Sequence, residues 1–149
     1  MTQQQALASA FPSPATFARQ TIFLTPEQLA AAKKESGVDF SDRLVVRYVG
    51  SNGRIAYFDT HRVRTQAETV MIVVTADAKI ERIDILSFDE PPDYFPKQRW
   101  IDQFKSRKLD NDLSLDRAIR PISGASLTGR AIVNASRKVL ALHRVIGTR

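Results

Sequence analysis

The middle of the chain alternates apolar and polar residues with the short period of a β-sheet. Thr69 to Thr75 is almost wholly apolar and β-branched and is too short for a core helix, so it predicts a central strand covered on both faces. In the next run, Lys79 to Phe88, Ile83 and Ile85 alternate with charged residues, as in a half-buried strand. A further strand is predicted over Phe17 to Leu24.

Apolar residues nearer the C-terminus recur with the longer period of a helix. We expect one long helix from about Ser126 to about His143. Its apolar stripe consists of Ile132, Ala135, Val139, Leu142 and Ile146.

Short signals predict the remaining elements. Thr2 is expected to cap a helix over residues 3–10. Thr25 lies before Pro26 and three residues before Gln28, which predicts a second capped helix that ends at Gly37. Gly50-Ser51-Asn52-Gly53 separates the β-rich runs 44–49 and 54–58, which predicts a hairpin.

Together these elements predict an α+β fold, with an antiparallel sheet of about five strands, flanking helices and a long C-terminal helix. We expect a single domain over residues 1–149, with a helix-strand-helix region in 1–40 and the core in 41–149. Between the last strand and the last helix we expect a stiff proline-rich loop over 89–96, a short helix over 99–105 and an exposed charged stretch over 108–120.

The composition is that of a soluble globular chain, with 43% hydrophobic and 26% charged residues and a net charge of +6. The basic residues are scattered and lack interleaved aromatic residues, so no nucleic-acid partner is expected. The absence of cysteine excludes disulfides, thiolate metal sites and cysteine nucleophiles. His61 and His143 have no partner at metal-ligand spacing, and no metal site is predicted.

Chemistry is predicted at the start of the long helix. Small and hydroxyl-bearing residues gather there, namely Ser123, Gly124, Ala125, Ser126 and Thr128. A helix N-terminus offers free N–H groups and the positive end of the helix dipole, and small side chains allow an anion to approach. The segment therefore suits a phosphate, although plain helix capping by serine would explain the motif taken alone.

Ser123-Gly124-Ala125-Ser126-Leu127-Thr128 resembles the Ser-Gly-Ala-Thr-x-Thr motif of the covalent FMN-binding domain family, which occurs in flavin-carrying subunits of the sodium-translocating NADH:quinone oxidoreductase and of Rnf electron-transport complexes. Glu90-Pro91-Pro92-Asp93-Tyr94 is similar to the family's Glu-x-Pro loop, and Trp100 to Lys105 is similar to the aromatic and Gln-Phe pattern that follows that loop. Arg120 stands where the family often has Asp.

The resemblance implies that a flavin transferase joins the FMN phosphate to Ser126, with Thr128 as the fallback position. It also implies redox protein partners, a membrane-associated electron-transfer complex as one setting, and an extracytoplasmic, periplasmic location with a leader ahead of Met1 in the precursor. The chain would be a redox carrier or a subunit of an oxidoreductase system rather than a stand-alone enzyme.

Several residues are candidates for the surroundings of the flavin ring. Tyr94, Phe95 and Trp100 offer flat walls, and the resemblance places Glu90 and Pro91 against the ring. Arg64 would stabilise the reduced, anionic flavin. The polar segment 61–65 is either an exposed loop or a rim around the flavin.

Two alternatives remain open from the sequence. The chain could bind FMN non-covalently in the same pocket. It could also be a cofactor-free binding or scaffold domain that uses its basic face on an anionic partner.

Overall fold

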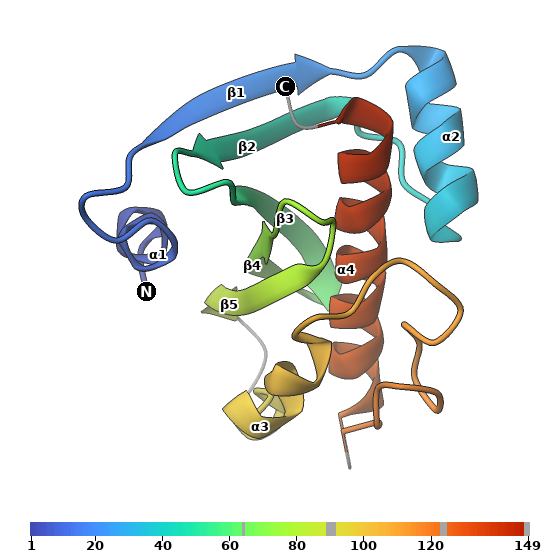
Figure 1. The fold of residues 1–149 in the computed structure, drawn as a ribbon. Coiled ribbons are helices and arrows are strands. Elements are labelled where there is room, and N and C mark those ends of the chain that lie inside the picture. The colour runs from blue at the N-terminus through green and yellow to red at the C-terminus, as the bar shows by residue number, and fades with distance from the viewer. Residues whose placement is uncertain (64, 89–91, 123–124, 148–149) are drawn as a thin grey trace.

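The computed structural model describes residues 1–63, 65–88, 92–122 and 125–147. Its strands are β1 (Phe17–Phe23), β2 (Leu44–Gly50), β3 (Ile55–Val63), β4 (Gln66–Val74) and β5 (Ile80–Phe88), and its helices are α1 (Gln3–Ala10), α2 (Pro26–Ser36), α3 (Gln98–Ile101) and α4 (Ser126–Ile146) (Figure 1). Two 3-10 turns, Pro92–Tyr94 and Asp102–Phe104, flank α3. The α+β fold predicted from the sequence is confirmed.

All five strands form one antiparallel sheet in the order β1-β2-β3-β4-β5, so each strand pairs with its neighbour in sequence. The predicted β2–β3 hairpin is present, and Gly53 at its turn adopts a positive φ of 83° that favours glycine. The β3–β4 pairing places His61 opposite Glu68 and Val63 opposite Gln66.

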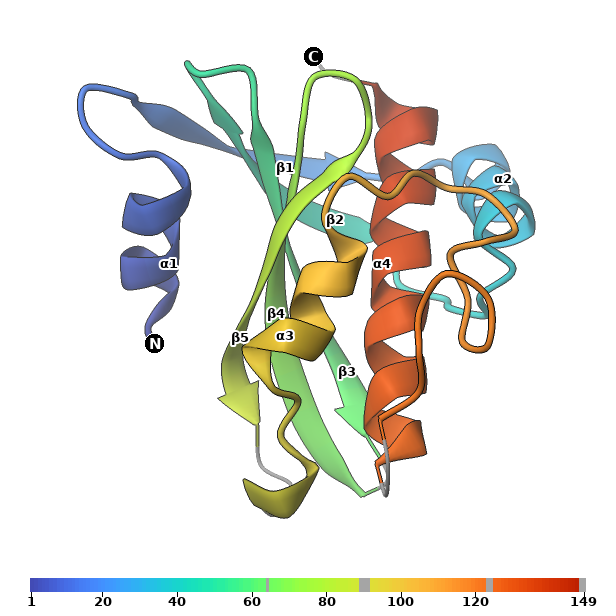
Figure 2. The same ribbon diagram turned by 60° about the horizontal axis from the view of Figure 1, so that its bottom comes forward.

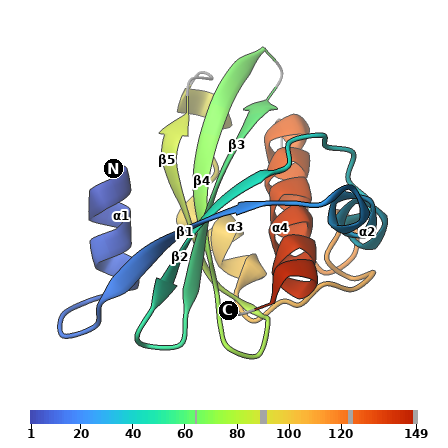
Figure 3. The same cartoon turned by 90° about the horizontal axis from the view of Figure 1, so that it is seen from above.

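Helices cover both faces of the sheet. α2, α3 and α4 lie on one face and α1 lies alone on the other (Figures 2 and 3). The larger core lies under α4 and includes Val70, Ile72, Ile132 and Val139, whereas Met71 and Val73 point to the smaller core under α1. Burial on both faces explains the continuous apolar run in β4. Among the described helices, none has the length and apolar character needed to cross a bilayer.

The predicted helix starts are confirmed by their hydrogen bonds. Thr2 and Gln5 form a capping box at α1, and Thr25 and Gln28 form a second one at α2. The C-cap of α2 is Gly37, in the left-handed conformation.

Two expectations were wrong. Residues 61–63 belong to β3 rather than to a loop, because the His61 ring finds hydrogen-bond partners within the sheet. The charged stretch 108–120 is irregular, but Leu113 and Ile119 within it are fully buried in the core under α4. The sequence pattern did not reveal these two buried residues, because they stand among charged residues and form no repeated helical or strand pattern.

Candidate functional site

The start of α4 presents an exposed hydroxyl at a helix N-terminus without a side-chain cap. Ser126 is the first residue of α4 and is exposed, and the N-cap residue, Ala125, makes no capping hydrogen bond. The first N–H groups of a helix have no partner within it. Free donors and the positive end of the helix dipole therefore lie beside the Ser126 hydroxyl.

The other motif residues differ sharply in exposure. Thr128 is only 1% exposed and Ala125 only 6%, whereas Leu127 is 51% exposed. Ser123 and Gly124 lie outside the described residues. Of the two candidate attachment points, only Ser126 is open to solvent.

Trp100 packs directly against the first turn of α4. Gly129 leaves room for this contact, because a Cβ at that position would lie 3.3 Å from Trp100 Cζ2, which is closer than most side chains pack. The indole also stacks edge-on with Phe104, at 5.2 Å between ring centroids. Trp100 is therefore fixed between the core and the helix that carries Ser126.

The backbone just ahead of the motif is held by the same segment. Trp100 Nε1 donates to the carbonyl oxygen of Arg120 at 2.5 Å, and the Arg120 N–H donates to Gln103 Oε1 at 2.8 Å. Gln103 in turn donates to the carbonyl of Trp100 at 3.0 Å. The predicted aromatic and Gln-Phe pattern thus positions the chain that leads into the motif, a role that sequence reasoning missed for Gln103.

A cavity of about 660 Å³ opens beside this contact. Its lining residues are Lys97, Arg99, Trp100, Gln103, Arg120 and Pro121. Ligand cavities commonly have volumes of roughly 300–1,000 Å³ and combine a flat apolar wall with a few polar groups. The indole supplies such a wall, and three cations surround it.

Of the remaining predicted ring contacts, the two that the structure describes, Tyr94 and Phe95, are not gathered at this cavity. Tyr94 is half-buried in the 3-10 turn ahead of α3 and is not among the lining residues. Phe95 packs edge-on against Phe88 and lines another cavity. Arg64, Glu90 and Pro91 lie outside the described residues.

A buried chain of charged groups, which the sequence did not reveal, links the sheet to α4. His61 Nδ1 lies 2.9 Å from Asp59 Oδ2, and His61 Nε2 lies 2.5 Å from Glu68 Oε1. Lys138 donates to the other oxygen of Asp59 at 2.9 Å. Among the described residues no group of three acidic or histidine side chains is arranged to hold a metal ion. The side chains of Asp59, His61, Glu68 and Lys138 form a hydrogen-bonded chain.

Comparison with known families identifies the family of the chain. The model of the FMN-binding domain matches residues 66–141, just over half of the 149 residues. The chain belongs to the FMN-binding domain family. FMN is therefore the cofactor, and the alternative of a cofactor-free scaffold is set aside. Searches of curated proteins and of solved structures find no match.

The described residues of this FMN-binding domain fit the cofactor. The matched segment contains the start of α4 and every residue that lines the Trp100 cavity. The helix N-terminus suits the FMN phosphate. The indole wall suits the flat, aromatic flavin ring.

Proposed function

We propose that this domain carries FMN covalently, through a phosphoester to the Ser126 hydroxyl, and relays electrons between redox partner proteins. The observation that carries the proposal is the exposed Ser126 at the uncapped start of α4. A phosphate bound there would accept hydrogen bonds from the free N–H groups of the first turn.

Burial favours Ser126 over Thr128 as the attachment residue. A transferase must bring the flavin phosphate to the hydroxyl oxygen, and Thr128 is 1% exposed and belongs to the buried face of α4. A serine hydroxyl forms the same phosphoester as the threonine of the family motif. The change of residue therefore leaves the chemistry intact.

The bond to Ser126 requires an activated flavin phosphate. An alcohol does not readily displace oxide from a free phosphate monoester, so the donor must hold the phosphate in an anhydride, as a flavin dinucleotide does. The Ser126 oxygen forms the new P–O bond and gives up its proton, the anhydride bond breaks, and a nucleoside monophosphate leaves. We assign this step to a separate flavin transferase.

Once bound, FMN supplies reversible electron transfer. The residues of this chain hold and orient it: the first turn of α4 binds the phosphate, and Trp100 offers a rigid wall. A carrier of this kind exchanges electrons with other proteins and needs no substrate pocket of its own. Covalent attachment prevents loss of the flavin to the surroundings, so we propose an extracytoplasmic location.

The test is the intact mass of the protein after co-expression with a flavin transferase. The native chain should gain the mass of FMN less one water, Ser126→Ala should gain nothing, and Ser126→Thr should regain it. Thr128→Ala is the matched control and should still be flavinylated. A native chain that stays unmodified beside an active transferase, or a Ser126→Ala variant that gains FMN, would contradict the proposal.

Non-covalent FMN binding is the second candidate, favoured by the ready-made cavity beside Trp100. Acid denaturation separates the two cases. A covalent flavin stays with the precipitated protein, whereas a non-covalent flavin leaves with the solvent.

A further inference from the structure

Among the described residues, the mouth of the Trp100 cavity carries three exposed cations and no acidic side chain. Lys97, Arg99 and Arg120 are exposed and line the cavity, and its other lining residues are Trp100, Gln103 and Pro121. Within the described part of the chain, none of the three cations forms an ion pair with a carboxylate. Their charge is therefore not neutralised locally.

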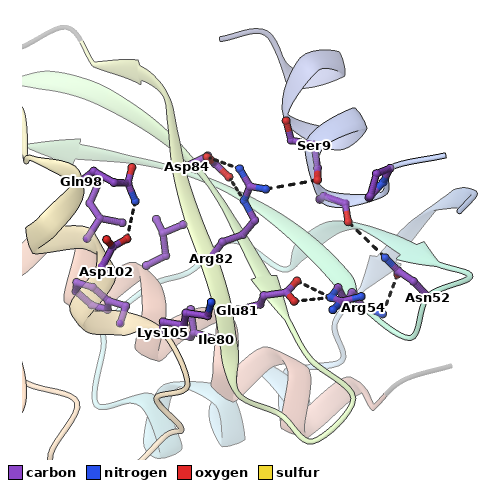
Figure 4. Close-up of a pocket in the computed structure, with 15 residues that line it drawn as sticks. Ser9, Asn52, Arg54, Ile80, Glu81, Arg82, Asp84, Gln98, Asp102 and Lys105 are labelled. Atoms are coloured by element: carbon purple, nitrogen blue, oxygen red, sulfur yellow. Dashed lines mark hydrogen bonds and ion pairs between the residues drawn. The ribbon is translucent and has the colours of Figure 1, made fainter.

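A cavity of about 520 Å³ on the other side of α3 shows the opposite arrangement. It lies between α1, β5 and residues 98–104, that is, α3 with the 3-10 turn that follows it, here called the α3 segment. Its arginines point at carboxylates (Figure 4). Arg54 pairs with Glu81, and Arg82 forms two hydrogen bonds with Asp84 at 2.7 and 3.0 Å. The arginines of this cavity are thus neutralised by carboxylates, whereas no carboxylate that the structure describes neutralises Arg99 or Arg120 at the Trp100 cavity.

We propose that the mouth of the Trp100 cavity is the docking surface for a redox partner protein whose contact surface is acidic. The inference rests on the proposed function, since electrons leave or reach FMN next to this mouth. Like charges lining a low-dielectric concavity focus their field outward and steer partners of opposite charge. Salt screens this attraction, because the Debye length at about 0.1 M ionic strength is only about 10 Å.

The first test measures the electrostatic potential at the mouth of the cavity, in protein without flavin. Trp100 is the only tryptophan of the chain and lines the cavity, so its fluorescence samples this site alone. With each quenching constant divided by that for free N-acetyltryptophanamide, iodide should quench it several-fold more efficiently than caesium at low ionic strength, and salt should reduce the difference. Equal quenching by the two ions would overturn the proposal.

Two triple variants separate the local charge from the total charge. Lys97→Gln, Arg99→Gln and Arg120→Gln together remove the three cations of the mouth. Arg19→Gln, Lys34→Gln and Lys79→Gln remove three exposed cations from β1, α2 and the β4–β5 turn, so the net charge falls by the same amount. Only the first triple should abolish the preference for iodide.

The second test uses matched protein acceptors with the flavinylated, chemically reduced domain. Native cytochrome c is basic, and its succinylated form carries the same haem on an acidic surface. At low ionic strength the succinylated form should be reduced roughly 10-fold faster, and this ratio should fall toward one with salt and in the mouth triple variant. The control triple should keep the preference.

The outcomes separate the two proposals. A flavinylated domain that reduces native cytochrome c as fast as the succinylated form overturns the docking surface and leaves the proposed function standing. A chain that never takes up flavin overturns the proposed function, and the docking proposal falls with it.

Discussion

At the scale of single residues, His61 shows most clearly how neighbouring side chains determine whether an ionisable group is charged. Both ring nitrogens face carboxyl oxygens, of Asp59 and Glu68, so both must carry a proton to donate. Burial opposes the charged imidazole, but these two hydrogen bonds and the negative charges raise the pKa of His61 to about 9. For Asp59, burial acts to raise the pKa, yet the hydrogen bond from His61 and the charge of Lys138 outweigh it and lower the pKa.

This gives a prediction for stability against pH. The folded state raises the pKa of His61 from 6.5 to about 9, so its contribution is fully present below about pH 6.5 and is lost as the pH rises through 9. By linkage the contribution is roughly 3 kcal/mol. Urea unfolding between pH 6 and 9.5 should show this fall in the native protein and a much weaker one in His61→Gln. An unchanged slope in the variant would show that another group titrates.

A second buried network, near the C-terminal end of α4, shows the reverse effect on histidine. Arg47 is fully buried and donates to the Tyr57 hydroxyl at 3.0 Å and to the Gly147 carbonyl at 2.5 Å. The Tyr57 hydroxyl is then free to donate to His143 Nδ1, which lies 2.8 Å away. Burial, and next the positive charge of Arg47, lower the pKa of His143, so this site favours the neutral ring.

Removing the Tyr57 hydroxyl should therefore lower the free energy of unfolding. Tyr57→Phe leaves buried donor and acceptor groups of Arg47 and His143 without their shared partner, so we expect a loss of about 1–3 kcal/mol in the free energy of unfolding. Tyr48→Phe is the matched control, since the Tyr48 ring packs on the opposite face of the sheet. Equal losses in the two variants, measured by urea unfolding, would contradict this account.

At the scale of elements, the α3 segment acts as a brace for the start of α4. Trp100 and Gln103 bind the carbonyl and the N–H of Arg120, and Trp100 also fills the space beside Gly129. Two consecutive parts of the site, the residues before the motif and the first turn after it, thus rest on one short segment. The geometry of the motif depends on this segment as well as on α4 itself.

We expect Gln103→Ala to loosen this brace. It removes the hydrogen bonds to Arg120 and Trp100, which should cost about 0.5–1.5 kcal/mol of stability and slow flavin attachment while Ser126 is unchanged. Gln98→Ala is the control, because among the described residues the Gln98 side chain bonds only to the exposed Asp102 at the C-cap of α3. The measurement is the initial rate of mass gain with purified transferase; a rate equal in both variants would exclude a positioning role.

At the scale of the whole molecule, the sheet separates two hydrophobic cores, and only one of them lies next to the candidate flavin site. The core under α4 supports the flavin site, whereas α1 seals the opposite face with Leu7, Ala10 and Phe11. Phe11 lies against Gly50, where any Cβ would collide with its ring. The contacts through which α1 stabilises the fold therefore lie on the opposite face of the sheet from the site.

Phe11→Ala should show this separation. Loss of a ring that is 3% exposed should cost about 3–5 kcal/mol, while flavin attachment measured well below the melting temperature should stay unchanged. Phe23→Ala, at a ring that is 67% exposed, should change stability by no more than about 1 kcal/mol. Calorimetry and the mass assay together check both parts; a parallel loss of flavin attachment would show that the two faces are coupled.

The sequence predicts what local rules determine. The capping boxes at Thr2 and Thr25 and the turn at Gly53 need only their neighbours, and all were found. The burial of Leu113 and Ile119 could not be predicted, because it depends on contacts with distant elements. The His61 chain left one usable signal: Asp59 and His61 share a face of a strand, and a tight hairpin would bring Glu68 opposite.

For the candidate flavin site, the sequence predicted the helix that begins at Ser126 and gave Trp100 as a candidate wall for the ring. It did not predict that Trp100 would pack on Gly129, or that Gln103 would hold Arg120, because both contacts join separate segments that only the fold brings together. The sequence also did not predict the positive charge at the cavity mouth. Arg120 lies 21 residues after Arg99 in the chain, and only the fold brings both to the same cavity.

The position of α4 in the order of elements has a consequence for biosynthesis. The five strands pair in sequence order, so the sheet can assemble while the chain is still being made. Ser126, however, begins the last helix, and that helix cannot close the larger core until it has been synthesised. If Ser126 is the attachment residue, a transferase that recognises the packed start of α4 would therefore modify only molecules that have completed their fold, which makes flavin attachment a late checkpoint in maturation.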